Sequence, residues 1–184
     1  FIGGKVIRHA ADLSIAAQTA IPYAHQLRDL AVAAHDGGIA FLVDQFKGSG
    51  LKDPSAKEHG IDLQAMAAKA VQQYAKYKAQ KKTLGSLDIA KLPGVNHPVF
   101  KDKPVNHDPR EVFIAKLFEE RGETNVFHQF YRALVQQLYD AGVSRNVYCV
   151  NIDAVIAALL LKMLWKPLQA GKIGESELET AAFT

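Results

Sequence analysis

The sequence has little cysteine and no long apolar run, and both absences restrict the classes of protein to which the chain can belong. Cys149 is the only cysteine among 184 residues, so no internal disulfide can form, and a thiol-reducing compartment, the cytoplasm, is expected. The longest apolar run, Val155 to Leu161, is too short to cross a bilayer and indicates a buried helix, so no membrane association is expected. No apolar core followed by a small-residue cleavage site is visible after Phe1, so no secretion signal is indicated.

Strong net charge is absent too. A net charge of +3 does not by itself indicate nucleic acid, and no such partner is expected, whereas anionic small molecules are compatible with it. Apolar residues make up 48% of the chain, which is enough for a folded core. The chain does not begin with methionine and ends in what reads as a helix, so we expect a fragment or a processed chain.

Motifs of several common catalytic sites are missing. The chain contains no CxxC, no HExxH, no GxSxG, and no glycine-rich phosphate loop after a strand. Its seven histidines are scattered, so no metal site is expected. The lysine-rich run from Lys76 to Lys82 is typical of a solvated helix end.

Helix-forming residues dominate what is present. Ala, Leu, Gln, Lys and Glu fill most segments and strand-like alternation is scarce, so we expect an all-α fold. Asp108 and Pro109 predict a helix start, and Gly122 predicts the end of that helix. The expected helices cover residues 12–35 (broken near Pro22), 39–46, 62–82, 108–122, 124–142 and, after a short extended piece, 152–165.

Two positions have features of catalytic residues. His97 lies in LPGVNHPVF, where two prolines prevent a helix and hold the imidazole rigidly, and Arg110 follows with a guanidinium that can bind a carboxylate. Asp153 begins an apolar helix, where it is either a helix cap or a base, because burial raises the pKa of a carboxylate. His97 and Asp153 together suit proton abstraction beside a carbonyl.

These segments resemble the citrate synthase superfamily. LPGVNHPVFKDKPVNHDPRE resembles the loop that typically reads PGFGH, then a short basic stretch, then DPR. RNVYCVNIDAVIAALLLKML resembles the segment that carries the family's catalytic aspartate in an N-V-D motif. The second is closest to citryl-CoA lyases and the citryl-CoA lyase module of ATP-citrate lyase. Both motifs come in the family's order, although Asn96 stands where the family prefers glycine.

The resemblance implies a role for each matching residue. His97 would hydrogen-bond the oxaloacetate carbonyl or the citryl hydroxyl, Arg110 would bind a substrate carboxylate, and Asp153 would move the acetyl-CoA proton. His35, in HDGG, is the only candidate for a second histidine on the enolate oxygen, and a helix-end histidine without a catalytic role is the alternative. Coenzyme A, as the acyl-CoA substrate, would lie against Pro93, Gly94, Val95 and Asn151.

The resemblance also implies an architecture and a reaction. We expect a homodimer in which residues 1–36 belong to a large helical domain, 37–151 form a smaller helical domain, and 152–184 return to the large one. The reaction would make or cleave a citryl-CoA-type carbon–carbon bond between acetyl-CoA and oxaloacetate, with cleavage favoured. A non-catalytic CoA- or carboxylate-binding regulatory or assembly module remains the alternative. A weaker one is a helical interaction domain whose lysine-rich face meets an anionic partner.

Overall fold

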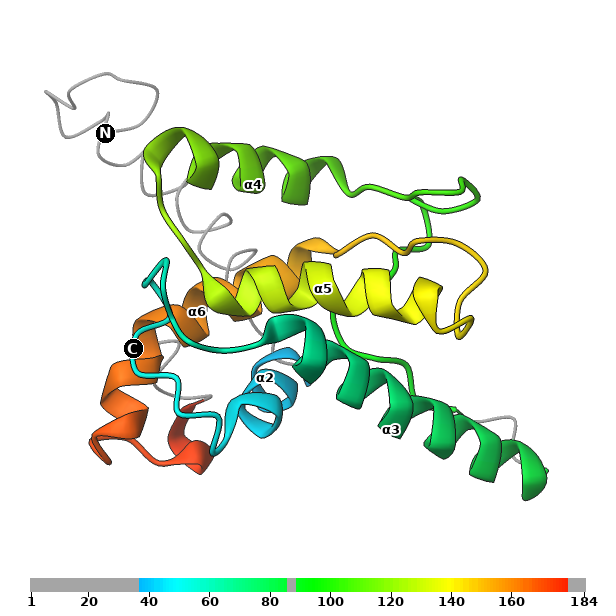
Figure 1. Cartoon of the computed structure of the whole chain (residues 1–184), viewed down its shortest axis with the longest axis horizontal. Helices are drawn as coiled ribbons and strands as arrows, with labels where there is room; N and C mark the ends of the chain where they lie inside the picture. Colours follow the sequence, from blue (N-terminus) through cyan, green and yellow to red (C-terminus); the bar gives the residue numbers. More distant parts are fainter. Residues whose placement is uncertain (1–36, 86–88, 179–184) are drawn as a thin grey trace, which may run out of the picture.

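The structure, a computed structural model, describes residues 37–85 and 89–178 of the chain, and these are helical (Figure 1). Within those ranges no strand forms, and the extended segments make only two isolated bridges, Val95 with Val150 and Val105 with Val147. The expected all-α class is therefore confirmed. The elements are α2 (Gly38–Phe46), α3 (Leu63–Thr83), α4 (Pro109–Arg121), α5 (Val126–Asp140), α6 (Ile152–Gln169) and the 3₁₀ turn η1 (Glu175–Glu177).

Helix α5 is the centre of the fold. It packs on α3 and on α6, α2 packs on α6, and Figure 1 shows α5 between α4 and α3. Aromatic side chains fill one end of the core: Phe46 packs edge-on to Phe127, with ring centroids 4.9 Å apart, and Trp165 packs on both. The indole Nε1–H of Trp165 donates to the carbonyl of Leu51 at 2.9 Å, which satisfies its buried polar atom.

Side-chain caps explain where helices α3, α4, α5 and α6 start. Asp108 accepts from the backbone N–H of Arg110, with Pro109 at the first helical position, and Gly122 ends α4 with a φ of 62°. The start of α6 differs from one expectation, because Asn151 is its cap and accepts from the N–H of Ala154. Asp153 lies inside the first turn instead, so the cap interpretation of Asp153 was wrong.

Helix α3 confirms the expected range but has a narrow apolar face. Only three of its residues, Ala67, Ala70 and Val71, are buried, and they lie on the side that meets α5. Its lysine-rich end contains Lys78, whose ammonium lies 5.6 Å from the ring centre of Tyr74. That lysine is therefore held over an aromatic ring rather than fully solvated.

Two expectations concern positions that the structure does not decide. The expected helices over 12–35 and the candidate residue His35 lie outside the described residues. The domain division at residues 151 and 152 stays a prediction, although α6 shares one hydrophobic core with α2 and α5. No helix in the described part of the chain has the length and apolarity to span a membrane.

Candidate functional site

The loop that carries His97 is hydrogen-bonded to the segment that leads into α6. Asn96 N–H donates to the carbonyl of Cys149 at 2.9 Å, and Asn151 N–H donates to the carbonyl of Gly94 at 3.0 Å. The amide of Asn151 also donates to the carbonyl of Asn96 at 3.2 Å. The two segments that resemble the family's motifs are therefore in direct contact, next to the helix start that holds Asp153.

The loop needs two residues in the left-handed backbone region. Gly94 has a φ of 75°, and Asn96, at the position where the family prefers glycine, has a φ of 69°. Asparagine tolerates this conformation better than most residues, and its Oδ1 accepts from the N–H of His97 at 2.9 Å. Asn96 therefore keeps the glycine-like backbone and adds a hydrogen bond that shapes the turn before His97.

The hydrogen bond to the His97 ring decides which of its nitrogens carries the proton. Val99 N–H donates to Nδ1 of His97 at 3.1 Å, so Nδ1 is an acceptor and the neutral ring carries its proton on Nε2. The imidazole stacks on Phe100, with ring centres 4.7 Å apart and the planes 28° from parallel. His97 is partly exposed, so the Nε2–H is available to a ligand.

Phe100 connects His97 to Arg110. The guanidinium of Arg110 lies 5.7 Å from the centre of the Phe100 ring, and His97 stacks on the same ring. Sequence reasoning missed Phe100, because an aromatic residue three positions after a histidine gave no sign of a contact with Arg110. His97 and Arg110, thirteen positions apart in the chain, therefore lie beside one ring.

Asp108 fixes the direction of the Arg110 side chain. Its carboxylate is fully buried and accepts from Arg110 Nε at 2.9 Å and Nη2 at 2.7 Å. Burial would raise the pKa of Asp108, but the hydrogen bonds from the side chain and backbone of Arg110 outweigh it, so the pKa is lowered. Asp108 therefore stays charged at neutral pH, and Arg110 keeps guanidinium hydrogens for a second carboxylate.

Asp108 also brings the starts of α4 and α6 together. Its Oδ2 accepts from the backbone N–H of Ile152 at 3.2 Å, beside Asp153. The pKa of Arg110 is raised, first by its hydrogen bond to Asp108, and the negative charge of Asp153 adds to this effect. Arg110 and Asp153 are thus electrostatic neighbours. Asp153 itself is partly exposed in the first turn of α6.

The thiol of Cys149 is a structural group here. Its Sγ donates weakly to the carbonyl of Phe100 at 3.6 Å, and the residue is buried. Burial raises the pKa of Cys149 to about 11, so the thiol is neutral near pH 7 and a poor nucleophile. Cys149 therefore helps to hold Phe100 and does not suggest cysteine chemistry.

The Gly37–Gly38 turn lies against the same loop. A Cβ built on Gly37 would lie 3.2 Å from Cγ of Pro93, which places the start of α2 beside the Pro93–Val95 backbone. The structure therefore brings the Pro93–Val95 backbone, Arg110 and Asn151 to the start of α6 beside Asp153, while the ring of His97, farther along the same loop, stacks on Phe100. In the described ranges, no group of three or more His, Cys, Asp or Glu side chains could hold a metal ion.

A small pocket borders the other side of the His97 loop. Its volume is about 170 Å³, below the roughly 300 Å³ at which ligand pockets usually begin, so it could hold only part of a large ligand. The lining combines aromatic rings with two lysines. It consists of Tyr74, Lys78, Lys91, Leu92, Val95, Asn96, Leu138, Val143 and Tyr148.

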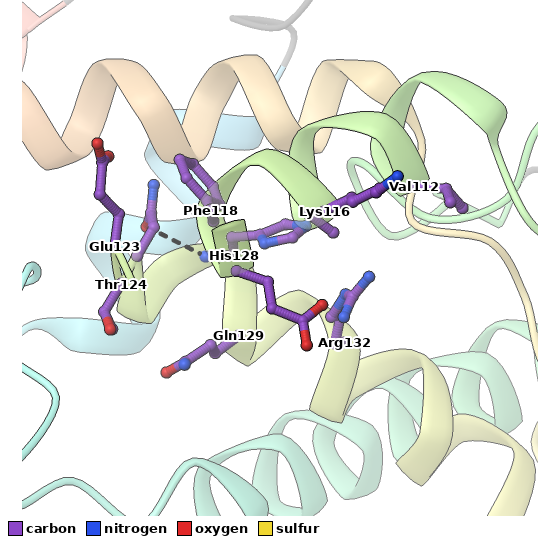
Figure 2. A pocket seen from close by; sticks show the side chains of 11 residues that line it. Val112, Lys116, Phe118, Glu123, Thr124, His128, Gln129 and Arg132 are labelled. Carbon is purple, nitrogen blue, oxygen red and sulfur yellow. Dashed lines mark hydrogen bonds between the residues drawn. The ribbon is translucent and has the colours of Figure 1, made fainter. Parts of the chain in front are cut away.

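A larger pocket lies between α4 and α5, away from the predicted residues (Figure 2). It measures about 480 Å³, and Figure 2 shows His128, Arg132, Lys116 and Gln129 around it. His128 Nε2 and Arg132 Nε each lie 2.8 Å from Oε1 of buried Glu111. None of the sequence-predicted site residues that the structure describes lines this pocket.

The Glu111 cluster explains how α4 is held to α5. Burial opposes the charge of Glu111, but the hydrogen bonds from His128 and Arg132 outweigh it and lower its pKa. A charged carboxylate only accepts, so His128 donates its Nε2–H to Glu111. The Glu111 carboxylate is thus paired with His128 and Arg132 and not with a ligand, which favours a structural role in holding α4 to α5.

Comparison with known proteins leaves the family open. No family model, no curated protein and no solved structure matches the chain. The basis for a function is therefore the resemblance of the two motif segments together with the contacts that join them.

Proposed function

We propose that this protein is a citrate synthase-like enzyme that makes or cleaves a citryl-CoA-type carbon–carbon bond, with cleavage favoured. The observation that supports this most is the direct contact between the two motif segments. Asn151 bonds the loop of His97, and Asp108 bonds the helix start of Asp153. These bonds support the proposal because they join the loop and the two helix starts that carry the residues proposed to bind the keto acid and to move the acetyl proton.

His97 and Arg110 would bind the keto-acid half of the substrate. Arg110, oriented by Asp108, would pair with a carboxylate of oxaloacetate or of the citryl group. The Nε2–H of His97 would donate to the oxygen that is a carbonyl in oxaloacetate and an alcohol oxygen in citryl-CoA. Because both side chains lie beside Phe100, this ring sets their separation.

Asp153 would handle the proton on the acetyl half. In cleavage, the citryl hydroxyl loses its proton to water as its oxygen becomes the oxaloacetate carbonyl. The electron pair of the broken carbon–carbon bond becomes the enolate of acetyl-CoA, and protonated Asp153 gives its proton to the enolate carbon. In synthesis the Asp153 carboxylate removes that proton, the enolate carbon attacks the oxaloacetate carbonyl, and the oxygen of that carbonyl takes a proton from water. The N-terminal end of α6, where Asp153 lies, also favours negative charge that develops nearby.

The lysine-lined pocket beside the loop suits part of coenzyme A. Tyr74 and Tyr148 offer faces for an adenine ring, and Lys78 and Lys91 offer positive charge for phosphates. Asn151 contributes indirectly, because its Oδ1 accepts from Ala154 and its Nδ2 donates to Asn96. We propose that it shapes the Pro93–Val95 backbone, which would contact the cofactor.

Citryl-CoA cleavage is the direct test. The protein is mixed with citryl-CoA, and the release of oxaloacetate and acetyl-CoA is followed with time. We expect turnover that falls by at least about 100-fold in Asp153→Asn, as for loss of a general acid or base. Asp140→Asn is the matched control, because this carboxylate is exposed at the end of α5 and should leave turnover unchanged.

Two results would count against the enzyme. No turnover by the unaltered protein in either direction would rule out the reaction, and full turnover by Asp153→Asn would rule out the role of that residue. Calorimetry that shows CoA binding without turnover would favour the regulatory or assembly module of the same fold. Homodimer formation and domain closure over the substrate belong to the proposal and are checked by sedimentation with and without citrate and CoA.

A further inference from the structure

Tyr131 has a buried hydroxyl without a hydrogen-bond partner. The residue, on α5, is fully buried, and its oxygen is the only buried side-chain polar atom in this state among the described residues. Leaving such a group unpaired costs roughly 1–3 kcal/mol. An uncompensated hydroxyl in a packed core therefore suggests a role outside packing, since phenylalanine would fill the same space.

The end of the Tyr131 ring lies where the candidate-site segments meet. A Cβ built on Gly94 would lie 3.0 Å from Tyr131 ring atoms and 2.6 Å from Cβ of Ala154. A Cβ built on Gly38 would lie 3.8 Å from the Tyr131 oxygen and 3.0 Å from Cβ of Ala157. The hydroxyl is thus placed between the start of α2, the His97 loop and the first turns of α6.

Asp153 borders the face of α6 that Tyr131 covers. It stands four residues before Ala157, so the two are neighbours on the helix surface, and it directly precedes Ala154 in the chain. No hydrogen bond or ion pair within residues 37–85 and 89–178 reaches its carboxylate. The Tyr131 hydroxyl, a donor without an acceptor, thus lies near the first turns of α6, where the Asp153 carboxylate accepts from none of the described residues.

Within residues 37–85 and 89–178, the charge of Asp153 raises the pKa of Arg110 at the start of α4 and that of Tyr131 on α5. Asp108 bonds the N–H of Ile152 next to Asp153, and Cys149 lies just before α6. Asp108 and Arg110 are bonded to each other, and Cys149 donates to Phe100. The pKa of Tyr131 is raised, first by burial and then by the charge of Asp153, so its hydroxyl stays protonated and able to donate.

We propose that Tyr131 is a positioning residue for Asp153, and that its hydroxyl donates a hydrogen bond to this carboxylate when substrate is bound. Rotation of the partly exposed Asp153 side chain brings the two groups together. The bond favours the charged carboxylate and fixes its direction toward the acetyl carbon. This inference rests on the proposed function for its catalytic meaning, but the hydrogen bond itself is measurable without turnover.

The first measurement is a carbon-13 NMR titration of the Asp153 carboxyl group with coenzyme A and citrate present. Its resonance is assigned from the peak that Asp153→Asn removes. Tyr131→Phe keeps the ring and loses the donor, so the titration midpoint should move to higher pH by about one unit, the equivalent of one hydrogen bond. Tyr139→Phe, which alters a more exposed tyrosine on the same helix, is the matched control and should not move it.

A second measurement uses the reaction. The basic limb of the kcat profile for citryl-CoA cleavage reports loss of the Asp153 proton in the substrate complex, so it should move to higher pH in Tyr131→Phe, with kcat reduced about tenfold for a misdirected carboxyl group. The thermal midpoint should be unchanged or higher, because an unpaired buried hydroxyl has been removed. Lower activity with equal or greater stability separates positioning from a purely structural role.

The outcomes separate this inference from the proposed function. An unchanged Asp153 midpoint in Tyr131→Phe overturns the Tyr131 proposal even if citryl-CoA is cleaved. A shifted midpoint in a protein that does not cleave citryl-CoA supports the hydrogen bond and rejects the proposed reaction. If Tyr131→Phe does not fold, the Cζ resonance of Tyr131 in the unaltered protein decides, because it must follow the titration of Asp153 if the two are bonded.

Discussion

Replacing Gly94 by alanine should destabilise the protein strongly, because the position is restricted in two independent ways. Its φ of 75° lies in the left-handed region, where a residue with a Cβ loses about 1–2 kcal/mol. The new Cβ would also lie 2.6 Å from that of Ala154 and 3.0 Å from the Tyr131 ring, and overpacking of this kind costs about 1–3 kcal/mol. The expected loss is therefore about 2–5 kcal/mol.

Thermal unfolding followed by tryptophan fluorescence suits this measurement. Trp165 is the only tryptophan of the chain and is buried in the core, so its emission reports unfolding of the packed helices. For a chain of this size each kcal/mol lowers the midpoint by about 2–4 °C, so Gly94→Ala should lower it by roughly 4–20 °C. Urea unfolding gives the free energy directly.

Gly50→Ala is the matched control for the backbone contribution. Gly50 has a similar φ of 82°, but a Cβ built there meets nothing within 4 Å, so only about 1–2 kcal/mol should be lost. Adding Ala154→Gly to Gly94→Ala removes the closest contact, and the double variant should lose less than the two single changes added together. Equal losses at positions 94 and 50 would refute the close approach of the loop to α6 and Tyr131.

The other predictions concern the two buried carboxylates. Asp108→Asn weakens the hydrogen bonds to Arg110 and Ile152 and should lower the free energy of unfolding by about 2–3 kcal/mol, and a loss below about 0.5 kcal/mol would contradict that geometry. The pKa of Asp108 is lower in the folded than in the unfolded protein, so its charge stabilises the fold above the unfolded pKa of about 4. This stabilisation is lost as pH falls through the folded pKa. Below about pH 4, the stability of Asp108→Asn should therefore depend less on pH than that of the unaltered protein. Glu111→Gln should weaken the attachment of α4 to α5 and speed amide hydrogen exchange in α4. The control Glu119→Gln alters an exposed residue of the same helix and should leave the exchange rates unchanged. Equal rates in both variants would show that the Glu111 cluster does not hold α4.

The sequence by itself determined the helix class and most helix ends. These features depend on residues close together in the chain, such as Asp108 and Pro109 at the start of α4 and Gly122 at its end. The amphipathic pattern of α5 likewise follows from its own residues. The same local reasoning selected His97, Arg110 and Asp153, because each stands in a short segment with a distinctive pattern.

Only the tertiary structure decided how these residues meet. Asn151 and Asn96, which are bonded, stand 55 positions apart in the chain, and Asp108 and Ile152 stand 44 apart. Phe100 between His97 and Arg110, and Tyr131 beside the first turns of α6, have no local signature at all. Their significance comes from packing and from hydrogen bonds between distant segments, which no pattern of neighbouring residues specifies.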